Sequence, residues 1–241
     1  MPLLTVQLDL IGYLREWQRA KEPDPAQAAV LAELAGADGV AVHMREDRRL
    51  IRDRDLYMLR EITKTRFVVE VAPTEAMIDL MCEIKPAQVN LVSEGADDLS
   101  ALPVDLSGTV DYKGIVSRLN AQGMTVSLFT SAQPDAIKTV GRTGAQGIVL
   151  DSNPYCSART LAEAQSELDR MDNLSQQARK QGLSVSVMRA LSAKNIPPLA
   201  ELGTIEEFIV GHSLIARASL VGMETAVRDL LPIVRFEPPR K

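Results

Sequence analysis

Short apolar segments alternate with helical segments along nearly the whole chain of 241 residues. Eight apolar segments have the length and bounding turn residues of strands in a parallel sheet: Leu3–Asp9, Gly39–His43, Arg66–Val71, Gln88–Val92, Thr125–Phe129, Gly147–Leu150, Ser184–Val187 and Glu207–Val210. Helices are predicted over Pro25–Ala35, Asp53–Ile62, Thr74–Lys85, Tyr112–Gln122, Pro134–Thr143, Thr160–Gln181, Lys194–Leu202, and from the last strand to about Val234. Eight such units favour a closed (β/α)₈ (TIM) barrel, for which ~250 residues is typical.

Glycine and proline support the boundaries of these elements. Predicted helices end at Gly36, Gly123, Gly144 and Gly182, and a strand begins two or three residues later. Each glycine suits the left-handed position just past a helix end, so this repeat indicates folding and not function. We expect one barrel over residues 1–235, a loose tail over Phe236–Lys241, and a long connection over Ser93–Asp111, a length that is often functional.

The composition excludes several classes of function. A net charge of −5 gives no basic footprint for nucleic acid. No apolar run approaches the ~20 residues that span a bilayer. The N-terminus, MPLLTVQLDL, has no basic side chain and does not resemble a signal peptide. We therefore expect a cytoplasmic protein with no membrane and no nucleic-acid partner.

No pattern for a metal or an organic cofactor is present. The two histidines and the scattered acids have no metal-ligand spacing, and Cys82 and Cys156 form no metal or redox pair. There is no phosphate-binding Walker loop, dinucleotide fingerprint or nucleophile elbow. We expect no metal and no cofactor. The basic cluster Arg45–Arg54 is interleaved with acids, which indicates either a solvated face or a local anion site.

Three polar residues follow neighbouring strands at one end of the predicted barrel. His43 ends the second strand, His212 follows the eighth, and Asp9 ends the first. The eighth, first and second strands are adjacent in a closed barrel, and active sites lie at the C-terminal ends of its strands. We expect a site role for at least one histidine. Asp9 would orient a histidine or bind a substrate hydroxyl, or else cap the following segment.

Glu70 is a carboxylate among valines in the third strand. A buried carboxylate is either paired or has a raised pKa, and a raised pKa suits a general base near neutrality. The alternative is a structural ion pair, for example with Arg45. We favour the functional interpretation, because Glu70 faces inward if the neighbouring valines pack on helices.

The junction Val210–Ser213 passes from the last strand into a helix. Gly211 lets the backbone approach a ligand closely, and the amides at a helix start favour anions. Because barrels of this kind often bind phosphate after their last two strands, the junction is a candidate phosphate site.

The sequence resembles the pyridoxine 5'-phosphate synthase family over nearly its whole length. The most specific match is AGADGVAVHMREDRR, Ala35–Arg49, and further matches are Pro23–Pro25, Asp53–Asp55, Glu70, Thr74–Glu75, Val126–Phe129 and Gly211–His212. The resemblance implies a metal-free (β/α)₈ barrel that works as a homo-octamer. It also implies condensation of 1-deoxy-D-xylulose 5-phosphate with 3-amino-2-oxopropyl phosphate, which yields pyridoxine 5'-phosphate, inorganic phosphate and water.

The resemblance assigns roles to individual residues. His43 and Glu70 match acid/base residues of the family, and Arg45 and Asp9 match substrate-binding residues. Gly211 and His212 match a contact to the product phosphate, and Ser100 stands in for a substrate-binding threonine.

The chain departs from the family pattern around the expected site. The family has Asn at Gln7, His at Leu10 and Leu50, Arg at Gln18, Glu at Val149, and Gly-His-Gly at Met188–Ala190. Arg189 thus occupies the position of a catalytic histidine, but it cannot shuttle protons at neutral pH and could bind phosphate in a bidentate manner. We expect Gln7 and Ala190 to contact substrate.

Three hypotheses about function follow. In the first, the chain is an enzyme of the pyridoxine 5'-phosphate synthase type. In the second, it is a relative that binds a phosphorylated metabolite or a partner protein without this catalysis. In the third, it is an enzyme for a different phosphorylated substrate, with Arg189 recognising a new anion.

Overall fold

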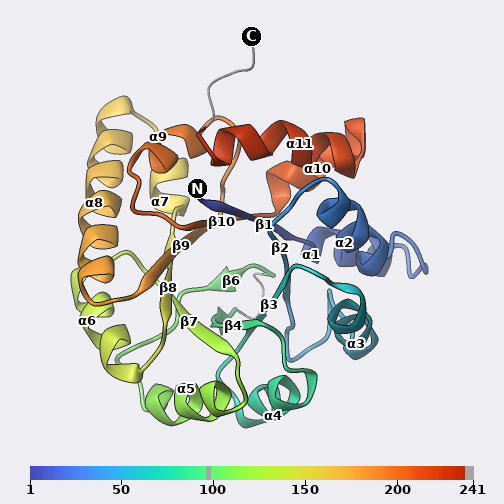
Figure 1. Ribbon diagram of the computed structural model, residues 1–241, viewed down its shortest axis with the longest axis horizontal. Coiled ribbons are helices and arrows are strands. Elements are labelled where there is room, and N and C mark those ends of the chain that lie inside the picture. Colours follow the sequence, from blue (N-terminus) through green and yellow to red (C-terminus); the bar gives the residue numbers. More distant parts are fainter. Residues whose placement is uncertain (96–98, 237–241) are drawn as a thin grey trace.

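The computed structural model describes residues 1–95 and 99–236, and within them eight parallel strands close into a barrel (Figure 1). The strands follow the ring order β1-β10-β9-β8-β7-β4-β3-β2. This arrangement confirms the predicted (β/α)₈ barrel and puts β1 between β10 and β2. The strand bounds are β1 (Leu3–Gln7), β2 (Gly39–His43), β3 (Arg66–Val71), β4 (Gln88–Leu91), β7 (Thr125–Thr130), β8 (Gly147–Asp151), β9 (Ser184–Met188) and β10 (Glu207–Val210).

The helices surround the barrel as an outer layer (Figure 1). They are α1 (Asp9–Trp17), α2 (Pro25–Leu34), α3 (Asp53–Ile62), α4 (Glu75–Ile84), α5 (Tyr112–Ala121), α6 (Pro134–Thr143), α7 (Asn153–Cys156), α8 (Leu161–Lys180), α9 (Ile196–Glu201), α10 (His212–Val221) and α11 (Met223–Val234). In the described part of the chain, none of them has the length and apolar character needed to cross a membrane.

Local capping chemistry explains several of the helix ends. The Asp24 side chain accepts a hydrogen bond from the backbone N of Ala26 at 2.9 Å, at the start of α2. Gly36, Gly123, Gly144 and Gly182 have φ values of 104°, 87°, 84° and 79°, so the predicted left-handed turns after helices are present. Thr74 takes the N-cap position of α4, but its hydroxyl donates to Glu46 instead of capping the helix.

The region after β1 differs most from the prediction. The first strand ends at Gln7, and Asp9 begins a helix, α1, that the sequence analysis did not predict. Gly12 permits this helix to lie close to the chain after β2, because a Cβ there would be only 2.3 Å from the carbonyl oxygen of Leu50. Asp9 therefore does not end a strand, and its side chain does not cap α1.

Smaller differences concern the long connection and the C-terminal third. The segment after β4 contains two strands of two residues each, β5 (Ser93–Glu94) and β6 (Ala101–Leu102), which pair antiparallel as a short hairpin. The last helical region is two helices, α10 and α11, divided at Gly222 with φ 85°. Of the predicted tail, residues 237–241 lie outside the described residues.

The barrel interior has apolar and polar layers. Its apolar cluster is formed by Ala41, Val68, Val92, Ala101, Phe129, Val149, Met188 and Ile209. At the N-terminal end of the strands, Glu207 accepts hydrogen bonds from Thr5 at 2.5 Å and Ser186 at 2.6 Å, and pairs with Arg66. These partners satisfy the buried carboxylate at this end of the barrel.

Candidate active site

A cavity of about 570 Å³ lies at the C-terminal end of the barrel strands. Seven of the ten predicted site residues line it: Gln7, Asp9, Ser100, Arg189, Ala190, Gly211 and His212. Leu10 and Leu50 also line it, so two of the positions at which the related family has histidine form apolar wall here. Most of the predicted site residues thus meet at this cavity, and their functional roles stay predictions.

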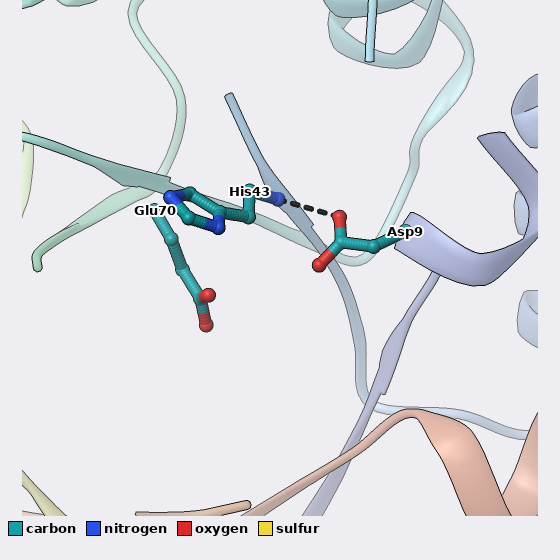
Figure 2. A group of neighbouring side chains, drawn as sticks. All are labelled: Asp9, His43 and Glu70. Carbon is teal, nitrogen blue, oxygen red and sulfur yellow. Dashed lines mark hydrogen bonds between the residues drawn. The ribbon is translucent and has the colours of Figure 1, made fainter. Parts of the chain in front are cut away.

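His43 and Glu70 lie behind the cavity wall, on the neighbouring strands β2 and β3. They are register partners, and Figure 2 shows their side chains together with that of Asp9. Both side chains are fully buried. Gln7 donates a hydrogen bond from Nε2 to Glu70 Oε2 at 2.8 Å, and Asp9 Oδ1 accepts one from the backbone N of His43 at 2.7 Å. Each buried residue is thus one side chain away from the cavity, through Gln7 or Asp9.

The environment of Glu70 matches the prediction from the sequence. Val69 and Val71 pack in the outer core, which turns Glu70 into the barrel beside Val68. Burial, with a further contribution from the Asp9 charge, raises the pKa of Glu70 from 4.5 to about 8. Among the described residues its side-chain hydrogen bond comes from Gln7, so the alternative of an ion pair with Arg45 is not formed.

The His43 imidazole lies near three carboxyl groups, those of Glu94, Asp9 and Glu70. Neither ring nitrogen has a hydrogen-bond partner among the described residues, although Nε2 is 3.7 Å from Glu94 Oε1. Burial lowers the pKa of His43, but the carboxyl groups of Glu94, Asp9 and Glu70 outweigh it and leave that pKa above its ordinary value. Burial also raises the pKa of Asp9, against the opposing charge of His43. Three neighbouring groups, Asp9, His43 and Glu70, thus have raised pKa values.

Arg45 is buried at the rim of this cluster and does not line the cavity. It donates to Asp47 at 2.8 Å and to the carbonyl oxygen of Gly95 at 3.1 Å, and it lies 3.8 Å from Glu94. Other arginines of the predicted basic cluster also pair with acids, as Arg48 does with Asp53. These pairs support the interpretation of the Arg45–Arg54 cluster as a locally compensated face.

The segment after β9 has an unusual backbone. Arg189 and Ala190 have φ values of 78° and 54°, a left-handed conformation that glycine adopts more easily. Ser152 Oγ donates to the Arg189 carbonyl at 2.6 Å, and Asn195 Nδ2 donates to the Ala190 carbonyl at 2.9 Å. The Arg189 guanidinium lies 3.4 Å from Asp151 Oδ2. This bonding holds a permanent positive charge at the cavity wall.

The last strand leads into α10 at Gly211 and His212. Gly211 lies close to β1, because a Cβ there would be 3.3 Å from the Cβ of Gln7. His212 is exposed and begins α10, so the first amides of that helix border the cavity. A helix N-terminus carries partial positive charge and unpaired N–H groups, which suits a phosphate.

Asp9, His43 and Glu70 also form a group of potential metal ligands. Their ligand-type atoms lie within 4.8 Å of one another, although the three residues show no metal spacing along the chain. A Glu70 pKa of about 8 suits a group that exchanges protons near neutrality, so the same three residues are also candidates for proton transfer. The expected absence of a metal and of a cofactor stays a prediction.

Sequence reasoning missed two acidic residues at the site, Glu94 and Asp151. Glu94 contacts His43 and Arg45, and Asp151 pairs with Arg189. Burial raises the pKa of Asp151, against the opposing charge of Arg189. Both acids follow a predicted strand at its C-terminal end, and that position is the signal that could have identified them.

Comparison with known proteins is consistent with this geometry. The chain is 42% identical over 229 residues to a pyridoxine 5'-phosphate synthase of Synechococcus sp., covering 94% of this chain and 96% of the relative. It is 40% identical over 239 residues to one of Geotalea uraniireducens, covering 98% of this chain and all of the relative. Among solved structures, KGPDC from Streptococcus mutans matches with a TM-score of 0.66 over 98% of each chain, at 12% identity, which shows the fold alone. The family "Pyridoxal phosphate biosynthesis protein PdxJ" matches residues 4–235, and the chain belongs to that family.

Proposed function

We propose that this protein is a pyridoxine 5'-phosphate synthase that condenses 1-deoxy-D-xylulose 5-phosphate with 3-amino-2-oxopropyl phosphate. The observation that carries the proposal is the buried pair His43 and Glu70, bonded to the cavity wall through Asp9 and Gln7. Relatives about 40% identical over nearly full length are named as this enzyme. The reaction joins an amine to a ketone, closes a ring and releases phosphate and water, so it needs several proton transfers.

The cavity offers a division of roles between binding and proton transfer. The phosphate ester of the sugar substrate would lie on the α10 amides at Gly211 and His212, next to the turn at Ala190. Ser100 and Asp9 would contact its hydroxyl groups. Arg45 is buried at the rim and would hold the phosphate of the amino-ketone once its present contact with Asp47 rearranges.

Glu70 and His43 would exchange protons with the reacting groups. A carboxyl with a pKa of about 8 is mostly protonated at neutrality and exchanges its proton readily there. Glu70 would protonate the departing hydroxyl during imine formation and take the proton back in ring closure. Gln7 lines the cavity, and its Nε2 donates a hydrogen bond to Glu70 Oε2 at 2.8 Å. His43 would act from the adjacent strand.

Arg189 would bind an anionic group of the substrate. Its guanidinium stays charged at neutral pH and is aligned by Asp151, so it cannot replace a proton-shuttling histidine. This observation favours a second candidate function, catalysis on a different phosphorylated substrate. The apolar wall at Leu10 and Leu50 supports the same alternative.

Supplying both substrates tests the proposal directly. We expect pyridoxine 5'-phosphate to form, detected by mass spectrometry, at a rate ~10²–10⁴-fold below that of relatives with a histidine at the Arg189 position, since one acid/base group is absent. Arg189→His combined with Leu10→His should raise the rate. Loss of the ion pair with Asp151 is checked separately by Arg189→Gln, which removes the charge without supplying an acid/base group and should not raise the rate.

Two outcomes would contradict the proposal. One is no turnover by the protein and no gain in the Arg189→His, Leu10→His variant. The other is turnover with a different phosphorylated ketose or amino-ketone in a substrate screen, and none with the two named substrates. A phosphate ester that binds tightly in calorimetry and is recovered unchanged would support the non-catalytic alternative.

Homo-oligomer formation, which family resemblance implies as an octamer, is part of the proposal. Large apolar side chains are exposed on α1 and α2, with Trp17 70% and Leu34 72% exposed. We expect light scattering to give several times the mass of one chain, and Trp17→Glu to lower that mass. Leu161→Glu is the control, since Leu161 is 92% exposed on α8, across the barrel from α2 (Figure 1). The cytoplasmic location stays a prediction.

A further inference from the structure

Glu94 lies between two of the residues that the proposed reaction uses. Its Oε1 is 3.7 Å from His43 Nε2, and its Oε2 is 3.8 Å from a terminal nitrogen of Arg45. The carboxylate also accepts from the backbone N of Glu46 at 3.3 Å. Its side chain is 13% exposed, so these contacts occur in a largely dehydrated environment where charge interactions are strong.

The same residue belongs to the hairpin that forms part of the cavity wall. Glu94 is the register partner of Ala101 in the antiparallel pair of β5 with β6. Ser100 and Ala101 both line the cavity. The pairing of β5 with β6 therefore links the cavity wall at Ala101, which substrate would contact, to Glu94, whose carboxylate contacts His43.

We propose that Glu94 is a positioning residue that holds the His43 imidazole and the Arg45 guanidinium in their working orientations. Only the expected effect of Glu94 on catalysis rests on the proposed function. The contacts themselves are independent of which substrate binds.

Three carboxyl groups face His43, each from a different element. Asp9 comes from α1, Glu70 from β3 and Glu94 from β5, and Arg45 follows His43 on the chain after β2. Burial raises the pKa values of Asp9 and Glu70, so these two carboxyl groups keep a proton to higher pH than an ordinary carboxyl group does. Glu94 contacts the Nε2 side of the ring, where no hydrogen bond is made among the described residues. It is therefore the group whose removal most directly changes the proton affinity of Nε2.

Hydrogen–deuterium exchange at the imidazole Cε1 position, followed by mass spectrometry against pH, tests this in the intact protein. The chain has two histidines, so His212 serves as an internal reference for His43. Glu94→Gln should lower the titration midpoint of His43 by about 1 pH unit, since a neighbouring opposite charge shifts a pKa by ~1–3 units. The midpoint of His212 should not move. Glu46→Gln is the matched control, because it removes the same charge from an exposed neighbour and should leave His43 unchanged.

A pH profile of kcat/KM provides the catalytic readout. If neutral His43 is needed as a base, the ascending limb of the profile should move to lower pH in Glu94→Gln and not in Glu46→Gln. Glu94→Asp, which keeps the charge but shortens the reach, should retain part of the His43 midpoint. It is the variant to use if Glu94→Gln does not fold.

The inference is overturned if the His43 midpoint is unchanged in both Glu94 variants, or if Glu46→Gln shifts it equally. These results are separate from the fate of the proposed function, because the exchange measurement needs no substrate. A shifted midpoint in a protein without synthase activity would support the role of Glu94 and count against the proposed reaction.

Discussion

Glu70→Gln is expected to lower kcat/KM by about 10²–10⁴-fold, the usual effect of losing a general acid/base group. The substitution keeps the size of the side chain and an oxygen that can accept the hydrogen bond from Gln7 Nε2, at 2.8 Å in the native protein. It removes the carboxyl group that binds and releases a proton with a pKa of about 8. Steady-state formation of pyridoxine 5'-phosphate from both substrates measures the effect.

Stability measurements separate this loss from misfolding. The raised pKa of Glu70, about 8 against an ordinary 4.5, means that the folded protein binds this proton more tightly than the unfolded chain. The contribution of Glu70 to the free energy of unfolding should therefore be greatest below its ordinary pKa and be lost as pH rises from 4.5 to about 8, and Glu70→Gln should lack this loss. Glu75→Gln is the control, since Glu75 is 81% exposed on α4, the helix after the same strand. Full activity in Glu70→Gln would remove Glu70 from the proposed mechanism.

Asp55→Ala is expected to destabilise the protein by about 3–5 kcal/mol, because it removes the buried partner of the Arg15 charge and leaves only the partly exposed Glu16. Arg15 and Asp55 are each 2% exposed, and they form two hydrogen bonds, of 2.8 Å and 2.6 Å, between α1 and α3. A third, at 3.4 Å, joins Arg15 to the Leu50 carbonyl. Urea unfolding measures the loss. Since Asp9 begins α1, substrate binding should weaken as well.

Two comparisons make the result interpretable. Asp229→Ala breaks the pair with Arg217, whose side chains are 54% and 46% exposed, and should cost only ~0–1 kcal/mol. Arg15→Met combined with Asp55→Leu replaces both charges by apolar groups and should recover most of the stability lost in Asp55→Ala. A loss in Asp55→Ala no larger than that in Asp229→Ala would show that the buried pair does not hold α1 in place.

Local patterns in the sequence were sufficient for most of the architecture. Strands such as Gly39–His43 were predicted with the observed bounds, because a continuous apolar run between turn residues is a local signal. The left-handed glycines after helices were predicted for the same reason. The helix α1 was missed because what favours it, the close packing of Gly12 on Leu50 and the burial of Arg15 with Asp55, is visible only once β1 and β2 are adjacent.

The candidate site also has features that local sequence patterns predict and features that they do not. Its end of the barrel, the inward direction of Glu70 and the proximity of Asp9 to His43 follow from strand order and the alternation of side chains along a strand. The bond from Gln7 to Glu70, the pairing of Asp151 with Arg189 and the contact of Glu94 with His43 do not. They depend on side-chain rotamers and on a hairpin whose position is set by packing.

The sequence by itself thus determined the barrel and its family, because each rests on a periodicity or a motif contained in neighbouring residues. Only the tertiary structure decided that His43 and Glu70 lie behind the cavity wall and that Glu94 and Asp151 join the site. Those facts arise from contacts between residues tens of positions apart, and the energy of such contacts depends on distances and burial that no local pattern encodes.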